Sequence, residues 1–285
     1  MTDSALAGLP GGAGFALVGV GLVLLYRVTG VVSFTQGAVG VYGALLFQRM
    51  TADGAPMVLA LVTGLLASAA IAALIGMVVA RWFLDASVII KSAVTIGVAV
   101  TLGTLALRLF SGSTGVFPFL LPSANVSVGE VTIPGNTLLG VGLAVVVAGG
   151  LGAVVRWTRL GVMMRAVSER APTAALLGVR VAVLNVGAWA TSGALAAIAL
   201  ILIAPTRQAD VATLSGVLAE AFAAALFASF TSLSLVVIGG LVIGIAEGIM
   251  LADSDLASYA QVIPIVVMVL VLLWRRRGEV WDEAR

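Results

Sequence analysis

Long runs of hydrophobic residues, separated by short polar breaks, make up most of the chain. A membrane-spanning helix needs roughly 20 mostly apolar residues, and the runs approach that length. They lack the apolar and polar alternation over about ten residues that is typical of a transmembrane strand. The pattern predicts an all-α fold, a polytopic transmembrane bundle of about eight to nine spans, with re-entrant or broken helices among the shorter ones. The expected spans are 12–32, 36–50, 56–80, 86–110, 136–156, 183–204, 213–230, 231–252 and 258–274.

The composition supports a protein that uses the bilayer as its solvent. Hydrophobic residues make up 61% of the chain and charged residues 10%, whereas soluble domains carry about 25% charged residues. The 34 glycines suit helices that pack closely inside a membrane. Cysteine and histidine are absent, which excludes disulfides, thiol catalysis and the usual zinc sites. The pI of about 9.5 mostly reflects arginines of expected cytoplasmic loops, so it does not indicate nucleic-acid binding.

Basic residues predict the orientation of the chain, because lysine and arginine concentrate on the cytoplasmic side of membrane proteins. Twelve of the 15 fall on one side of the expected spans, so we expect a multi-pass protein of the cytoplasmic membrane with its N-terminus outside and its C-terminus in the cytoplasm. The inner set is Arg27, Arg81, Lys91, Arg156, Arg159, Arg165, Arg170, Arg180, Arg275, Arg276, Arg277 and Arg285; the outer set is Arg49, Arg108 and Arg207. We expect one transmembrane domain over 1–285, with an external loop over 111–135 whose prolines predict turns.

Three segments carry a resemblance to a known family. They read YRVTGVVSFTQG over 26–37, WTRLGVMMRAVSE from 157 with AALLGV from 174, and IGGLVIGIAE over 238–247. With these segments the chain resembles the permease subunits of branched-chain amino-acid ABC importers, the Liv-type family, over nearly its whole length. Ser33 and Gln36 stand where the family has Asn and His, and Arg27 replaces a family Gly. If these positions line the path, a substrate other than Leu, Ile and Val is open to this chain.

The break from Ser33 to Gly37 interrupts about forty largely apolar residues. Its hydroxyl and amide groups can satisfy backbone groups of an unwound helix that lines a path; the alternative is an ordinary loop at the membrane surface. A Ser-Phe-Thr triplet at 33–35 recurs at 229–231, by internal repeat or by coincidence.

Two acids, Glu220 and Glu247, fall inside expected spans. A charge at the bilayer centre costs roughly 2.5 kcal/mol or more, so each should face protein or water. They are candidates for the transport path, or else they hold helices together. The candidate path residues are Ser33, Thr35, Gln36, Gly37, Glu220 and Glu247.

The inner loop over 157–182 is expected to contain a short helix that Pro172 opens and Gly178 closes. The family resemblance implies that this helix docks in a groove of an ATPase subunit and transmits its motion. The alternative is a basic loop that only fixes topology. The candidate coupling residues are Arg159, Gly161, Met164, Arg165, Glu169, Pro172, Ala174 and Gly178.

The chain itself lacks a phosphate-binding loop, because its single lysine, Lys91, is not preceded by a glycine-rich turn. It is therefore not expected to be an enzyme or to hold a cofactor, and ATP and magnesium would bind in partner subunits. The resemblance implies two ATPase subunits, a second identical or homologous permease, and an external substrate-binding protein. The cargo would be a branched-chain or related small amino acid, with amides and urea left open. The alternatives are an ion-coupled secondary transporter, in which Glu220 or Glu247 carries protons, and a non-transporting scaffold.

Overall fold

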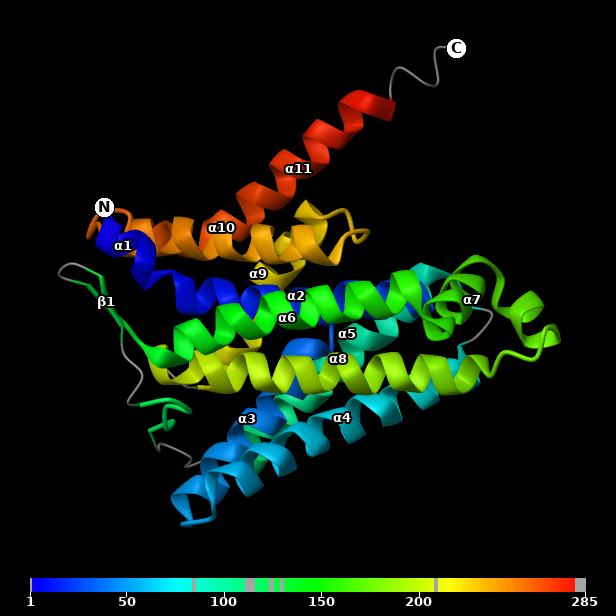
Figure 1. Cartoon of the computed structure of the whole chain (residues 1–285), viewed down its shortest axis with the longest axis horizontal. Coiled ribbons are helices and arrows are strands. Elements are labelled where there is room, and N and C mark those ends of the chain that lie inside the picture. Colours follow the sequence, from blue (N-terminus) through cyan, green and yellow to red (C-terminus); the bar gives the residue numbers. More distant parts are fainter. Residues whose placement is uncertain are drawn as a thin grey trace.

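The computed structural model describes residues 2–83, 86–110, 116–122, 126–128, 131–207 and 210–279. Most of these residues are helical (Figure 1), which confirms the predicted all-α class. The elements are α1 (Thr2–Ala7), α2 (Leu9–Thr29), α3 (Gln36–Ala52), α4 (Met57–Trp82), α5 (Val88–Leu109), β1 (Val126–Val128), β2 (Val131–Ile133), α6 (Gly135–Trp157), α7 (Arg159–Leu176), α8 (Val181–Ile203), α9 (Val211–Phe227), α10 (Leu233–Leu251) and α11 (Ile263–Glu279), with two 3-10 turns, Ala204–Thr206 and Ala257–Val262.

Each of the nine predicted spans has a helix in the structure. In the described part of the chain, seven helical segments are long and apolar enough to cross a membrane. The helices α3 and α9 are shorter, at 17 residues each. Figure 1 shows α7 at one end of the bundle and the N-terminus with the β1 strand at the other. We call these the α7 end and the N-terminal end.

Two stretches differ from the sequence prediction. The first span begins earlier than expected, because α1 and α2 together form an apolar segment over Ser4–Thr29, and it ends where Gly30 adopts a left-handed φ of 66°. The loop predicted to contain turns also holds an antiparallel hairpin, β1 with β2. Both strands contain valine, and β2 also contains threonine and isoleucine, residues that favour extended backbone. Residues 111–115, 123–125 and 129–130 of that loop lie outside the described residues.

The core surrounds α2 and α8, which are the most deeply buried spans. In helices α4, α5, α6 and α11 only a minority of the residues are buried inside the bundle, as expected of helices that face lipid. Helix α11 leans away from the other helices (Figure 1). The bundle thus has two deeply buried spans, α2 and α8, and four spans with few buried residues, α4, α5, α6 and α11.

Glycines let α2 and α10 approach closely. A Cβ built on Gly244 would overlap the backbone of Gly12, and one built on Gly240 would meet the backbone of Ala16. Small residues at such crossings allow backbones to pack by van der Waals contact. The glycine-spaced segment 238–247 is therefore a helix-packing surface against α2.

Helix α3 begins inside the bundle and not at its surface. The carbonyl of Val39 accepts a hydrogen bond of 2.8 Å from the hydroxyl of Ser68, which lies near the midpoint of α4. Gln36 is one turn before Val39, so residues 30–35 return from the α7 end toward the middle of the bundle as non-helical chain. The expected span over 36–50 therefore crosses only part of the bundle.

Candidate functional site

The polar break lies in the protein interior. Ser33, Thr35 and Gln36 are each at most 1% exposed. The hydroxyls of Ser33 and Thr35 are 2.9 Å apart and hydrogen-bonded, and the amide of Phe34 donates to the Thr95 hydroxyl of α5 at 3.1 Å. A loop at the membrane surface would expose such groups to water. The break is thus a buried polar segment and not a surface loop.

Gln36 is the residue of this segment whose side-chain amide lacks hydrogen-bond partners. Neither its amide oxygen nor its amide nitrogen has a partner among the described residues, although both are buried. A buried polar group without a partner costs about 1–3 kcal/mol. Gly40, one turn later, faces Ala196 of α8, so Gln36 lies on the side of α3 that faces α8. Its amide is free to bond a visiting molecule.

Aromatic rings connect the break to α9 and to the α7 end of α2. Phe34 stacks on Phe222 with ring centroids 4.8 Å apart. Phe222 is 6.4 Å from Phe230, which is 5.0 Å from Tyr26. The two Ser-Phe-Thr triplets therefore meet through Phe222. Their backbones differ, however, because Ser229 and Phe230 adopt positive φ angles of 55° in a tight turn, which does not support an internal repeat.

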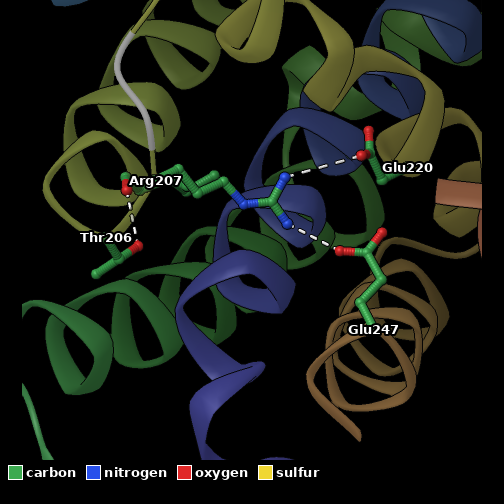
Figure 2. Close-up of polar contacts among 5 residues, drawn as sticks. Thr206, Arg207, Glu220 and Glu247 are labelled. Atoms are coloured by element: carbon green, nitrogen blue, oxygen red, sulfur yellow. Dashed lines mark hydrogen bonds and ion pairs between the residues drawn. The ribbon is translucent and has the colours of Figure 1, made fainter. Parts of the chain in front are cut away.

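The two buried acids share one arginine (Figure 2). The guanidinium of Arg207 lies 2.8 Å from the Glu247 carboxylate and 3.9 Å from the Glu220 carboxylate. It also lies over the ring of Phe15, 5.0 Å from the centroid. One oxygen of each carboxylate, Glu220 Oε2 and Glu247 Oε1, has no partner among the described residues. The charged cluster thus joins the loop after α8, which carries Arg207, to α9 and α10, which carry the two acids, and to α2.

The six candidate path residues therefore form two groups on opposite faces of α9. Gly37 contacts Ser215 and Leu218 of α9. Glu220 is two residues after Leu218, about 200° around the helix, and points to Arg207. The structure brings Ser33, Thr35, Gln36 and Gly37 together and places the two acids elsewhere.

A cavity of about 460 Å³ opens at the α7 end, and we call it the α7 cavity. It lies between the ends of α2 and α4, the starts of α5 and α8, and α7. Most of its lining is apolar, with polar contributions from a few side chains. The lining residues are Val28, Thr29, Gly30, Val31, Gly76, Val79, Ala80, Lys91, Val167, Ser168, Ala171, Pro172, Ala175, Val181, Ala182, Asn185 and Trp189.

The candidate coupling loop forms α7, which consists of two helical pieces. Arg170 has non-helical angles, φ −150° and ψ 94°, and separates them. Pro172 follows in the first turn of the second piece, and Gly178 ends it with a φ of 84°, as the sequence predicted. The first piece was not predicted; the Thr158 hydroxyl caps it by accepting from the amide of Gly161 at 3.3 Å.

The candidate coupling residues differ in how far they are buried. Gly161 and Ala174 are buried, and Arg165 donates to the Val155 carbonyl at the end of α6. Met164 is half-buried. The exposed residues are Arg159, Arg165, Glu169, Pro172 and Gly178. The most exposed apolar side chains of the second piece are Leu176 and Leu177, at 89% and 78%.

Several residues of these sites were not predicted from the sequence. Arg207 could have been found, because a charge buried in a membrane span requires a partner and Arg207 is the nearest arginine before Glu220. No sequence pattern marks Asn185, Trp189 or Thr95, which the fold brings to the α7 cavity and the polar break from distant spans.

Comparisons with known proteins agree with the helical architecture. The fold is similar to a chain of a solved structure described as PsaBC from Streptococcus pneumoniae in complex with Fab, with a TM-score of 0.50 and 12% sequence identity over 95% of this chain and 90% of that chain. A search of curated proteins found no match. Residues 5–272 match the family model for the branched-chain amino acid transport system permease component. The chain therefore belongs to this family of transport permeases.

Proposed function

We propose that the chain is the transmembrane permease subunit of an ATP-driven importer that carries branched-chain or related small amino acids across the cytoplasmic membrane. Family membership supports the transport role. The observation that carries the ATP-driven part is the exposed apolar pair Leu176 and Leu177 at the tip of α7. Large apolar side chains on a helix that projects from the bundle fit a hydrophobic groove on a partner protein.

The α7 end faces the cytoplasm in this proposal. Helix ends and loops there carry many of the basic residues, as the positive-inside rule requires. These are Arg27, Arg81, Lys91, Arg156, Arg159, Arg165, Arg170 and Arg180. Two ATPase subunits that bind ATP and magnesium would engage α7 from that side. A second permease, identical or homologous, and an external binding protein would complete the importer.

The transport path passes the polar break in this proposal. Ser33, Thr35 and Gln36 offer hydroxyl and amide groups inside an otherwise apolar bundle, and these can bond an amino-acid head group briefly. Apolar neighbours such as Phe34 and Phe222 accept an aliphatic side chain. A few weak polar contacts suit transport, because tight binding would trap the cargo.

Glu220 and Glu247 stabilise the bundle in this proposal. Both face Arg207 and lie on the side of α9 away from the polar break. This arrangement favours the ATP-driven importer over a proton-coupled transporter, which needs an acid that is free to exchange protons along the path.

The test is uptake of radiolabelled leucine into vesicles that contain the permease, the ATPases and the binding protein. We expect uptake to require ATP and to persist when an uncoupler collapses the proton gradient. Uptake that is equal with and without ATP, or that the uncoupler abolishes at constant ATP, would contradict the proposal.

A cross-link tests the contact itself. The chain has no cysteine, so Leu176→Cys introduces a single thiol. We expect this variant to cross-link to an ATPase subunit. Leu256→Cys is the matched control, because Leu256 is an exposed leucine at the N-terminal end of the bundle; equal capture by both variants would count against α7 as the docking element.

A further inference from the structure

A second cavity, of about 330 Å³, lies beside the α7 cavity at the same end of the bundle. It is enclosed by the ends of α2 and α6, by α7, and by the turn between α9 and α10. Two arginines line it together, Arg27 from α2 and Arg165 from α7, so we call it the arginine cavity. None of the described residues that line it is acidic.

The positive charge of the arginine cavity is not balanced within the described part of the chain. Arg27 is half-buried and forms no ion pair with a described residue. Arg165 donates to the carbonyl of Val155, which carries no net charge. Glu169, the acid nearest to Arg165 in the sequence, is exposed and forms no ion pair with a described residue either. Two guanidinium groups in one cavity repel each other, so an anion between them would stabilise both.

The arginine cavity lies at the level where a membrane-spanning helix ends. The apolar segment Ser4–Thr29 ends two residues after Arg27, which is about 3 Å along the helix axis. Trp157, two residues after the cavity residue Val155, is 78% exposed. Exposed tryptophans are typical of the boundary between the hydrocarbon core and the head groups, and lipid phosphates lie at the same boundary.

An apolar surface leads from the arginine cavity along α10. Leu235 follows the cavity residue Thr231 by four positions. Leu235, Ile238 and Val242 are each about half exposed, and their spacing of three and four residues places them on one face of the helix. An acyl chain attached to a group in the cavity can therefore lie along this face.

We propose that the arginine cavity binds the phosphate of an anionic phospholipid between the guanidinium groups of Arg27 and Arg165. Guanidinium groups suit this role because they bind phosphate oxygens through paired N–H donors. Basic pockets between membrane helices recognise anionic head groups in this way. The inference requires only that the chain spans a bilayer, so it depends neither on the cargo nor on ATP.

The same features disfavour two related ligands. A free phosphate ester has no acyl chain to place on the apolar face of α10, and it would have to reach the boundary of the hydrocarbon core from water. Phosphatidylcholine would bring a choline cation beside two arginines, in a cavity whose described lining has no acid to receive it. The cavity therefore favours a phosphate that belongs to a lipid and carries a net negative charge.

The test measures how strongly two lipids associate with this site in bilayers that contain only the purified full-length permease. The chain has no cysteine, so Trp157→Cys provides one attachment point for a fluorescent label near the cavity. The quencher is phosphatidylglycerol or phosphatidylcholine with a nitroxide near the top of one acyl chain, added to a phosphatidylcholine bilayer. We expect phosphatidylglycerol to associate about tenfold more strongly, because hydrogen bonds between charged groups contribute about this much.

Variants in the labelled background show which arginines bind the phosphate. Arg27→Met should remove most of the preference for phosphatidylglycerol, whereas Arg27→Lys should keep part of it, because lysine retains the charge without the paired donors. Arg165→Met should act in the same direction. It also loses the bond to the Val155 carbonyl, so Arg165→Lys and the melting temperature of each variant separate lipid binding from folding.

Arg156→Met is the matched control. Arg156 is an exposed arginine beside the label, but it does not line the arginine cavity. Its loss should leave most of the preference for phosphatidylglycerol, because it contributes only to the general attraction between a basic surface and anionic lipid.

A further arm separates a lipid from a free phosphate. Glycerol phosphate in large excess in the water should leave the quenching by phosphatidylglycerol unchanged. If it removes the preference, the cavity binds free phosphate esters and the assignment to a lipid is wrong. Equal quenching by the two lipids, or a loss in Arg156→Met as large as that in Arg27→Met, would also overturn the inference. These measurements involve neither ATP nor an amino acid, so their failure would leave the proposed function standing.

Discussion

The guanidinium of Arg207 lies 2.8 Å from the carboxylate of Glu247, so a residue that follows α8 is joined to the last turns of α10. Glu220 of α9 lies 3.9 Å away on the same guanidinium. Two carboxylates thus share one cation. Substitutions of the arginine and of the acids should therefore destabilise the protein to different extents.

Replacing Arg207 by methionine should destabilise the protein most. It leaves two buried carboxylates without their cation, and breaking such a pair costs on the order of 3–5 kcal/mol. Glu220→Gln should cost less, because the closer Arg207–Glu247 pair remains. The melting temperature in detergent, followed by tryptophan fluorescence, measures both. Arg49→Met, an exposed arginine at the same end, is the control; a loss as large as that of Arg207→Met would show that the ion pair contributes little.

Gly244→Val should disrupt the crossing of α10 with α2, because a side chain there would overlap the backbone of Gly12. Overpacking of this kind costs about 1–3 kcal/mol. We expect a lower melting temperature and a smaller yield of monodisperse protein. Gly142→Val on α6 provides the comparison, since nothing lies within 4 Å of a Cβ at Gly142. Similar behaviour of the two variants would refute the close approach of the helices.

Gln36→Leu should separate stability from transport. The substitution removes two buried polar atoms that have no partner among the described residues, so the melting temperature should be unchanged or higher. Leucine uptake should fall about tenfold if the amide bonds the cargo. Gln48→Leu, a buried glutamine near the other end of α3, should retain uptake. Wild-type transport by Gln36→Leu would remove Gln36 from the path.

Asp210 makes a small part of the stability depend on pH. Its carboxylate caps α9 and accepts hydrogen bonds from Thr213, from the side chain and from the backbone amide, which lower the pKa of Asp210 below its ordinary value. The stabilisation is therefore complete above the unfolded-state pKa of about 3.9 and is lost as the pH falls through the lower folded value. An asparagine side chain at this position does not titrate, so the variant Asp210→Asn would keep its helix cap at every pH.

The measurement compares melting temperatures of the wild type and Asp210→Asn between pH about 6 and pH about 3. The wild type should lose more stability than Asp210→Asn over this range. Parallel curves would mean that the Asp210 cap does not contribute.

Hydrophobic runs were enough to predict the helical spans, because a span of apolar residues has few other stable arrangements in a membrane. The cap of α7 was also predictable, since Pro172 and Gly178 act through local backbone geometry. The burial of Gln36 inside the bundle could not be predicted from the sequence. Whether a polar break lies at the surface or inside the bundle depends on contacts such as Val39 with Ser68, which are 29 residues apart.

The meeting of the two buried acids at one arginine also could not be predicted from the sequence. Each could be recognised alone as a costly charge, but the face of α9 that carries Glu220 depends on how α9 packs between α2 and α3. Lys91 and Asn185 meet at one cavity because the starts of α5 and α8 lie at one end of the bundle. Such meetings follow from tertiary packing, which a single sequence does not specify.

The interior start of α3 has an energetic consequence for any opening of the bundle at the α7 end. There, residues 30–35 take the place that a full-length span would occupy, and non-helical chain has no internal ladder of hydrogen bonds to break. Moving residues 30–35 would break the hydrogen bond from the Phe34 amide to the Thr95 hydroxyl and the stacking of Phe34 on Phe222. If the transport path passes the polar break, as proposed, an opening that moves only residues 30–35 would leave the long helices around them intact.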